Sequence, residues 1–286
     1  MSDPTATDGP DRPTATVATA ETKSEPGDGR PRSSRAKRIL VQTGIGLGSL
    51  VLVLGLALLI LMGYFHPGNE HRYSVAVAQP LDDSPLRGHR VLFLGSSVTQ
   101  GHRGESFVDY LARIDGLAAV KEAVGGTTLT NDSDSSYVAR LHRIATDQTF
   151  EAVVVQLSTN DASGHKPVGR PLGPGHDLTQ YDTATVAGAI EHIIAYSHQT
   201  WDCPVIFFTG TKYDSADYAR LVDLIIEIKT AWNIGLLDLW HDPDMNAVAT
   251  DDYDLYMLFD GIHPTRAGHK LWWTPAFETY LTEQLT

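Results

Sequence analysis

The sequence of 286 residues contains a single cysteine, Cys203, and only 22 basic residues against 35 acidic ones. One cysteine excludes an intrachain disulfide framework and any zinc or iron–sulfur site built from several cysteines. The formal net charge of −13 disfavours binding to the phosphate backbone, so we expect no nucleic-acid partner. The chain also lacks an internal repeat, which excludes solenoid and propeller architectures.

Two segments with different compositions precede the bulk of the chain. Residues 1–38 have almost no large apolar side chains, which predicts a disordered cytoplasmic tail. An uncharged apolar run follows over residues 39–65, long enough for one membrane-spanning helix. Basic side chains gather directly before the run, and no comparable cluster follows it: Arg30, Arg32, Arg35, Lys37 and Arg38. The positive-inside rule therefore predicts a single-pass protein of the cell membrane, with its N-terminus cytoplasmic and the remainder extracytoplasmic.

The alternative for the apolar run is a cleaved signal peptide. The run is longer than the about 7–15 apolar residues of a typical signal peptide. The only nearby A-x-A pattern, at residues 76–78, lies well beyond it. We therefore favour an uncleaved anchor, followed by a stem over residues 66–87.

Residues 88–286 alternate between short apolar runs and amphipathic stretches. The apolar runs predict strands, and the stretches between and after them predict helices. The strands are expected at 90–94, 118–124, 152–157, 204–208 and 235–239, and the helices at 105–114, 136–145, 185–198, 216–232 and 266–285. Continuous Val, Ile, Leu and Phe runs are typical of strands in parallel sheets. The pattern predicts a three-layer α/β/α domain with a central parallel five-stranded sheet, whose ligands bind at the carboxyl edge.

Polar residues follow the predicted strands at that edge. Ser97 follows the first strand, Gly126 the second and Asn160 the third, while Asp260 and His263 follow the last. A serine nucleophile needs a base within hydrogen-bond reach, and the base needs a carboxylate that orients it. We expect His263 to take the proton of Ser97 and Asp260 to hold the imidazole. The amides of Ser97 and Gly126 and the side-chain NH₂ of Asn160 are candidate donors to an oxyanion.

These blocks resemble those of the SGNH/GDSL hydrolase family, which is named after a serine, a glycine, an asparagine and a histidine. Ser97, Gly126, Asn160 and His263 match these four, Asp260 completes the triad, and the resemblance covers roughly residues 88 to 285. It implies a flavodoxin-like fold and a serine esterase or acylhydrolase without a metal or organic cofactor. It leaves the substrate open among small-molecule, lipid and carbohydrate esters.

The nucleophile turn departs from the family pattern. The family usually has Gly-Asp-Ser, and here Ser96 replaces the aspartate, so that two serines are adjacent. The position in the motif favours Ser97 as the nucleophile. Gly125 and Gly126 are also adjacent, and the spacing favours Gly126 as the donor. Because no G-x-S-x-G pattern surrounds Ser97, we do not expect the α/β-hydrolase fold.

The sequence thus predicts a membrane-anchored, extracytoplasmic esterase that transfers an acyl group to water, with a small acyl group on an envelope carbohydrate or lipid as the favoured substrate. An acyltransferase with the same residues, or a non-catalytic surface-binding module, are the alternatives. Asp161 is expected to order its loop rather than act as a second acid. The long loop over 164–181 is expected to border the substrate cleft.

Overall fold

A computed structural model describes residues 33–286, with side chains from Lys37 onward. The predicted tail therefore lies outside the described residues, except for residues 33–38, which begin helix α1 (Ser33–Leu61). The chain divides into two compact units between Leu54 and Gly55. The second unit contains the end of α1 and the whole α/β domain.

Helix α1 contains a stretch that is long and apolar enough to cross a bilayer. The stretch is Lys37–Leu61, of 25 residues, with a hydropathy of 2.6. Its side chains are all exposed in the protein itself, which suits contact with lipid and not a place in a soluble core. The helix ends where Gly63 adopts a left-handed conformation with φ of 70°.

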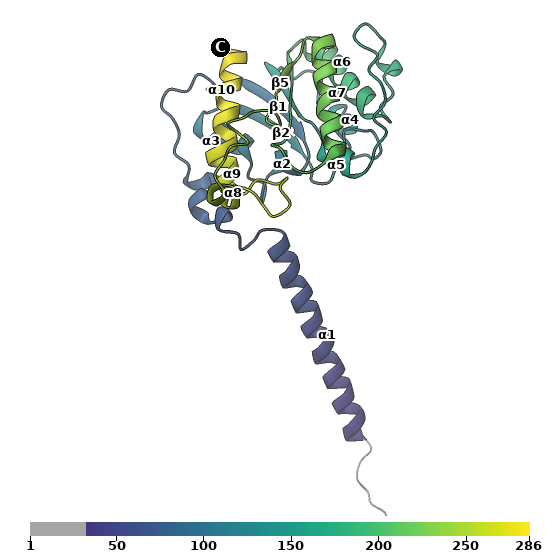
Figure 1. Ribbon diagram of the computed structural model, residues 1–286, viewed down its shortest axis with the longest axis vertical. Helices are drawn as coiled ribbons and strands as arrows, with labels where there is room; N and C mark the ends of the chain where they lie inside the picture. Colours follow the sequence, from purple (N-terminus) through teal and green to yellow (C-terminus); the bar gives the residue numbers. More distant parts are fainter. Residues whose placement is uncertain (1–32) are drawn as a thin grey trace, which may run out of the picture. The chain divides into compact units, whose positions relative to one another are not determined.

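A parallel five-stranded sheet forms the centre of the domain (Figure 1). Its strand order is β2-β1-β3-β4-β5. Its strands are β1 (Arg90–Gly95), β2 (Ala118–Ala123), β3 (Ala152–Gln156), β4 (Val205–Phe208) and β5 (Gly235–Leu237). All pairs are parallel, and in β1 and β3 Val91 pairs with Ala152. The order is that of a flavodoxin-like sheet, so the predicted fold class and all five predicted strands are confirmed.

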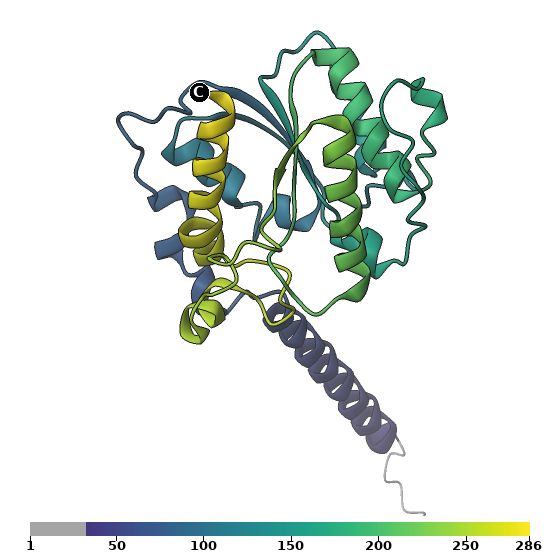
Figure 2. The same ribbon diagram turned by 45° about the horizontal axis from the view of Figure 1, so that its top comes forward.

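Helices cover both faces of the sheet, as the turned view shows (Figure 2). The helices of one face are α3 (Phe107–Ile114) and α10 (Thr274–Leu285), and those of the other are α4 (Tyr137–Leu141), α6 (Val186–Trp201) and α7 (Ala216–Trp232). Strand residues alternate between the two cores: Val91 and Phe93 pack with α3 and α10, whereas Leu92 and Leu94 pack with α4, α6 and α7. The period of two places apolar side chains in both layers.

Shorter elements lie in the connections. They are α2 (Ser97–Gln100), α5 (Thr159–Ser163), α8 (Thr250–Tyr256), α9 (Arg266–Gly268), the π-helical η5 (His269–Trp273), and the 3₁₀ turns η1 (Pro67–Asn69), η2 (His71–Tyr73), η3 (Val75–Val77) and η4 (Leu178–Gln180). The predicted helix over 266–285 is therefore α9, η5 and α10 in succession. The π-helical turn of η5 is wider than an α-helical turn. It is stabilised by Thr274, whose hydroxyl donates to the carbonyl of His269 at 2.7 Å. The predicted helix over 136–145 shortens to α4, because 3₁₀-type bonds follow it at Arg143 and Ile144.

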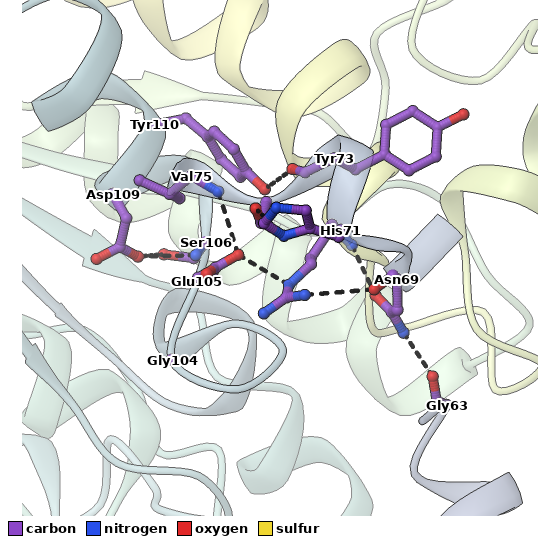
Figure 3. A network of polar contacts seen from close by, with 12 residues as sticks. Gly63, Asn69, His71, Tyr73, Val75, Gly104, Glu105, Ser106, Asp109 and Tyr110 are labelled. Atoms are coloured by element: carbon purple, nitrogen blue, oxygen red, sulfur yellow. Dashed lines mark hydrogen bonds and ion pairs between the residues drawn. The ribbon is translucent and has the colours of Figure 1, made fainter. Parts of the chain in front are cut away.

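The predicted stem, residues 66–87, packs against the domain. Asn69, Ala78 and Leu86 are buried. The hydroxyl of Tyr110 in α3 donates to the carbonyl of Tyr73 (Figure 3). The stem thus packs over α3 and the loop before it. It does so through three 3₁₀ turns, whose sequence has no periodic apolar pattern.

Candidate active site

The predicted site residues gather at the carboxyl edge of the sheet, where β1 lies between β2 and β3. This is the point at which the strand order reverses, and open α/β sheets bind ligands there. Ser97 is the first residue of α2, directly after β1, and Asn160 lies in α5, after β3. Asp260 and His263 lie in the turn between α8 and α9. The fold therefore brings together residues that are far apart in sequence.

Ser97, His263 and Asp260 form one continuous series of hydrogen bonds. Ser97 Oγ lies 2.7 Å from His263 Nε2, and His263 Nδ1 lies 2.6 Å from Asp260 Oδ2. The other carboxylate oxygen, Oδ1, accepts from the backbone N–H groups of Ile262 at 2.9 Å and of His263 at 3.0 Å. The Asp-x-x-His spacing therefore fixes the carboxylate from its own turn and directs it at the imidazole.

The Asp260 carboxylate is stabilised in its charged form. Burial raises its pKa, but the hydrogen bonds from the His263 ring and from the two backbone N–H groups together outweigh burial. The pKa of Asp260 therefore lies below its ordinary value. An ionised Asp260 keeps a proton on Nδ1 of His263, which leaves Nε2 free to accept the proton of Ser97.

The side chain of Gln156 gives the two adjacent serines different roles. The sequence analysis did not identify this residue. Its Oε1 accepts from the backbone N–H of Ser96 at 3.0 Å and from the N–H and hydroxyl of Thr99 at 3.1 and 2.8 Å. Its Nε2 donates to Ser96 Oγ at 3.1 Å, and Ser96 is fully buried. Ser96 is thus a structural part of the turn, and only Ser97 faces His263. In the sequence, the one sign of this role is a single glutamine at the end of the otherwise apolar run 152–156.

The two adjacent glycines also differ. The amide of Gly125 donates to the side-chain oxygen of Gln100 at 3.0 Å, so it is already used. Gly126 has a φ of 77°, where a side chain is strained, and a Cβ would meet nothing within 4 Å. No acceptor for the Gly126 amide is found in the described part of the chain. Of the two glycines, Gly126 therefore remains the candidate oxyanion donor.

Asn160 and Asp161 connect α5 to the loop after β2. Asn160 Nδ2 donates to the carbonyl of Thr127 at 2.9 Å, which leaves the second hydrogen of its NH₂ for a ligand. The buried Asp161 carboxylate accepts from the backbone N–H groups of Leu129 at 2.7 Å and Thr130 at 3.1 Å. Asp161 thus orders the loop that carries Gly126, and it is not hydrogen-bonded to the histidine.

Replacing Asn160 with alanine is expected to lower kcat for ester hydrolysis by about 10²–10³-fold, because one donor to the oxyanion is lost. Since this donor acts on the transition state, kcat and kcat/KM should fall together. Steady-state kinetics on p-nitrophenyl acetate measures the effect, and circular dichroism checks that the variant is folded. A folded variant that loses less than about fivefold would show that Asn160 does not bind the oxyanion.

Arg140 is a second residue that the sequence did not single out. Its guanidinium is buried and donates to the carbonyl of Gly95 at 2.7 Å, to the carbonyl of Glu122 and to Thr127 Oγ1 at 3.3 Å. Burial lowers its pKa. These acceptors lie at the ends of β1 and β2, directly before the serine turn and beside Gly126. Arg140 therefore fixes the spacing between the nucleophile turn and the oxyanion loop.

A cavity of about 340 Å³ adjoins Ser97. Its lining includes Asp260, His263 and His269 as well as the apolar Val98 and Leu258. The size is within the range of small-molecule sites. None of its lining residues comes from the loop 164–181, among the residues that the structure describes. That loop is hydrogen-bonded to α6 instead. The backbone amides of Leu172 and Gly173 donate to the buried carboxylate of Glu191, in α6, at 2.9 and 2.6 Å.

Burial of His269, beside this cavity, makes the domain sensitive to acid. The side chain is 1% exposed, and its Nδ1 has no hydrogen-bond partner. Burial, together with the charge of Lys121, lowers its pKa to about 3. In the unfolded chain a histidine takes a proton near pH 6.5, so the unfolded state binds more protons between pH 6.5 and 3. The free energy of unfolding should therefore fall as the pH drops through this range.

We expect His269 alone to reduce the free energy of unfolding by about 2 kcal/mol between pH 7 and pH 5. Urea titrations at both pH values measure the loss. The variant His269→Gln, which is neutral in both states, should lose about 2 kcal/mol less than wild type over the same interval. Equal losses in the two proteins would contradict this role of His269.

Comparison with known proteins agrees with this architecture. Residues 93–271 match the GDSL-like Lipase/Acylhydrolase family. Among solved structures, a protein from Lactobacillus plantarum is similar with a TM-score of 0.58 and 19% identity, over 70% of this chain and 99% of that one. A possible lipase from Chitinophaga pinensis DSM 2588 has a TM-score of 0.52 and 16% identity, over 69% of this chain and 99% of the other. No curated protein matches the chain significantly.

The two solved structures, at their low identities, show the fold alone. The family match extends over well more than half of the chain and includes every predicted site residue. It agrees with the resemblance found in the serine, glycine, asparagine and histidine blocks. The chain is an ester-hydrolysing enzyme and belongs to the GDSL-like lipase/acylhydrolase family.

Proposed function

We propose that this enzyme is a membrane-anchored serine esterase whose catalytic domain lies outside the cytoplasm. The observation that carries the proposal is the hydrogen-bonded series from Ser97 through His263 to Asp260. In this series the nucleophile, the base and the orienting acid are already within reach, so no side chain has to move before attack. The proposed reaction is hydrolysis of carboxylic esters, with deacylation of an envelope carbohydrate or lipid as the favoured case.

In the first step Ser97 Oγ attacks the ester carbonyl while His263 Nε2 takes its proton. The carbonyl oxygen becomes an oxyanion, which the amides of Ser97 and Gly126 and the NH₂ of Asn160 stabilise. Asp260 stabilises the imidazolium that has formed. The tetrahedral intermediate collapses, the alcohol leaves with the proton from His263, and the acyl group stays on Ser97.

In the second step water resolves the acyl-enzyme. His263 takes a proton from the water, whose oxygen attacks the acyl carbonyl, and Ser97 then leaves with that proton. The side chains of His263 and Asp260 keep 35% and 31% of their surface exposed, so water has access to the base. This access favours hydrolysis over transfer to another acceptor. No step in this scheme requires a metal or an organic cofactor.

The proposed location rests on α1 and the charges around it. The helix is long and apolar enough to span a bilayer. The basic cluster between Arg30 and Arg38 precedes it in the sequence, and the part of the chain after it is acidic. The positive-inside rule supports a cytoplasmic N-terminus and an extracytoplasmic domain. The ester substrate would then be part of the cell envelope.

The proposal is tested with the full-length protein in detergent or nanodiscs. We expect a fluorophosphonate probe to label one serine, identified as Ser97 by mass spectrometry, and p-nitrophenyl acetate to be hydrolysed. Labelling without turnover of any ester in water would favour an acyltransferase. A folded protein that neither labels nor hydrolyses would overturn the proposal in favour of a binding module.

A further inference from the structure

The segment that leaves the membrane helix is joined to the catalytic end of the domain. We call residues 61–69 the exit segment, because they connect the last residue of α1 to the end of η1. Its Asn69 is buried, with Nδ2 donating to the carbonyl of Gly63 at 2.8 Å (Figure 3). Asn69 Oδ1 accepts from the backbone N–H of Arg266 at 2.9 Å. Arg266 follows His263 by three residues, so the exit segment is fixed against the turn that holds the base.

A second connection runs to the loop after α2. The guanidinium of Arg266 pairs with Oε2 of Glu105 at 2.8 Å. The same oxygen accepts from the backbone N–H of Val75 at 3.2 Å (Figure 3). The ring of Tyr64 lies 5.8 Å from that of His102, and the guanidinium of Arg103 lies over Tyr64 at 4.2 Å. The exit segment therefore touches both loops that border the nucleophile.

Gly63 shows how closely the exit segment approaches the catalytic turn. A Cβ at this position would lie 2.6 Å from the side chain of Leu258, which precedes Asp260 by two residues. The amide of Leu258 in turn donates to the carbonyl of His263 at 2.9 Å. Leu258 is thus held between the exit segment and the base. A residue with a side chain at position 63 would have to displace the Leu258 side chain, and its backbone would be strained at a φ of 70°.

The exit segment also forms part of the cavity beside Ser97. Leu61 and Met62 line the same cavity of about 340 Å³ as Ser97 and His263. Together with Leu258 they make one side of it apolar. An apolar group attached to the ester carbonyl that Ser97 attacks can therefore contact this apolar wall in the same cavity. That wall comes from the end of the membrane helix.

Exposed aromatic side chains surround this region. Phe65 is 66% exposed in the exit segment, and Phe259, next to Leu258, is 74% exposed. Exposed apolar side chains that gather in one place are typical of surfaces that contact lipid or a partner. Phe259 directly follows Leu258, whose side chain lies beside Gly63, two residues before Phe65. Leu61 is also the last residue of the apolar stretch Lys37–Leu61, so one residue belongs both to that stretch and to the cavity lining.

We propose that Leu61 and Met62 are substrate-contacting residues that determine specificity, and that the enzyme takes an amphiphilic ester whose apolar chain lies at the lipid interface. The inference rests on the proposed function, because it assigns the apolar wall to the substrate of the Ser97 site. The anchor is then part of the substrate-binding cavity, in addition to holding the domain at the membrane.

The test uses full-length protein in phosphatidylcholine nanodiscs and two esters, p-nitrophenyl acetate and p-nitrophenyl decanoate. The double variant Leu61→Ala, Met62→Ala removes the wall, and Leu56→Ala is the matched control, because Leu56 lies in α1 but does not line the cavity. Rates are divided by the number of sites that the fluorophosphonate labels at saturation. A variant that fails to fold therefore cannot be mistaken for one with altered specificity.

We expect the decanoate-to-acetate ratio of kcat/KM to fall about tenfold in the double variant and to stay at the wild-type value in Leu56→Ala. The change should come from KM for decanoate. An unchanged ratio in the double variant, an equal change in the control, or a labelled wild type that does not hydrolyse decanoate would overturn the inference while leaving the esterase intact. A wild type that neither labels nor hydrolyses would overturn the proposed function, and the inference with it.

Discussion

Replacing Ser97 with alanine is expected to lower kcat for p-nitrophenyl acetate by about 10⁴-fold or more and to abolish labelling by a fluorophosphonate. Ser97 is the only serine whose hydroxyl is hydrogen-bonded to His263 among the described residues, with Oγ 2.7 Å from Nε2. Alanine removes the atom that attacks and leaves the oxyanion donors in place. The small activity that remains should come from these donors acting on direct attack by water.

Ser96→Ala is the matched control, because it makes the same chemical change one residue earlier. Ser96 is fully buried and its hydroxyl accepts from Gln156, so alanine removes a structural hydrogen bond and no nucleophile. We expect Ser96→Ala to be labelled, with the free energy of unfolding lowered by about 1–3 kcal/mol. Labelling that persists in Ser97→Ala and disappears in a folded Ser96→Ala would assign the nucleophile to Ser96.

Asp260→Asn is expected to lower kcat about 10⁴-fold with little change in stability. Asp260 Oδ1 accepts from the backbone N–H groups of Ile262 and His263, and the amide oxygen of an asparagine can keep both bonds. The amide NH₂ would then face His263 Nδ1 and donate to it. The ring would carry its proton on Nε2, which could no longer accept the proton of Ser97.

Measurement of kcat and of the labelling rate between pH 6 and pH 10 checks this second prediction. Both should fall together in Asp260→Asn, since both depend on the base, and urea titration should show a free energy of unfolding close to that of wild type. Asp244→Asn is a control for the loss of one negative charge in an exposed loop, and it should keep its activity. A loss of less than about tenfold in Asp260→Asn would show that Asp260 does not set the tautomer of His263.

The sheet was predictable from the sequence largely because its central strands, β1, β3 and β4, are buried on both faces. Runs such as 152–155 are continuously apolar, and the pattern identified the five strands to within two residues at each end. Short elements were not predictable in this way. α2 and α5 have four and five residues, too few for an amphipathic period. α5 begins where the Ser158 hydroxyl accepts from the Asp161 amide, whereas in α2 the Thr99 amide donates to the side chain of Gln156.

The site shows the same division between local and long-range order. Ser97, Gly126 and Asn160 come soon after strands, so a rule about strand ends pointed to them. Asp260 and His263 come after α8, and their Asp-x-x-His spacing pointed to them instead. Gln156 and Arg140 act through groups that are 60 and 45 residues away in sequence. No local sequence pattern predicts such contacts. In the sequence, a buried polar residue only interrupts an apolar pattern, and its role becomes clear once the structure shows its partners. The packing of the stem could not be predicted for the same reason, since Asn69 is hydrogen-bonded to Arg266, which is 197 residues away in sequence.

The bond between Asn69 and Arg266 also has a consequence for biosynthesis. It joins the first part of the domain to the last, and the ribosome adds the 197 residues between them in about 10–40 s. Ser97 emerges early in this interval and His263 near its end, 166 residues later. A nascent or C-terminally truncated chain therefore carries a nucleophile without its base. If His263 is the base, as we propose, esterase activity requires that synthesis has passed residue 263, so shorter copies are inert towards the esters around them.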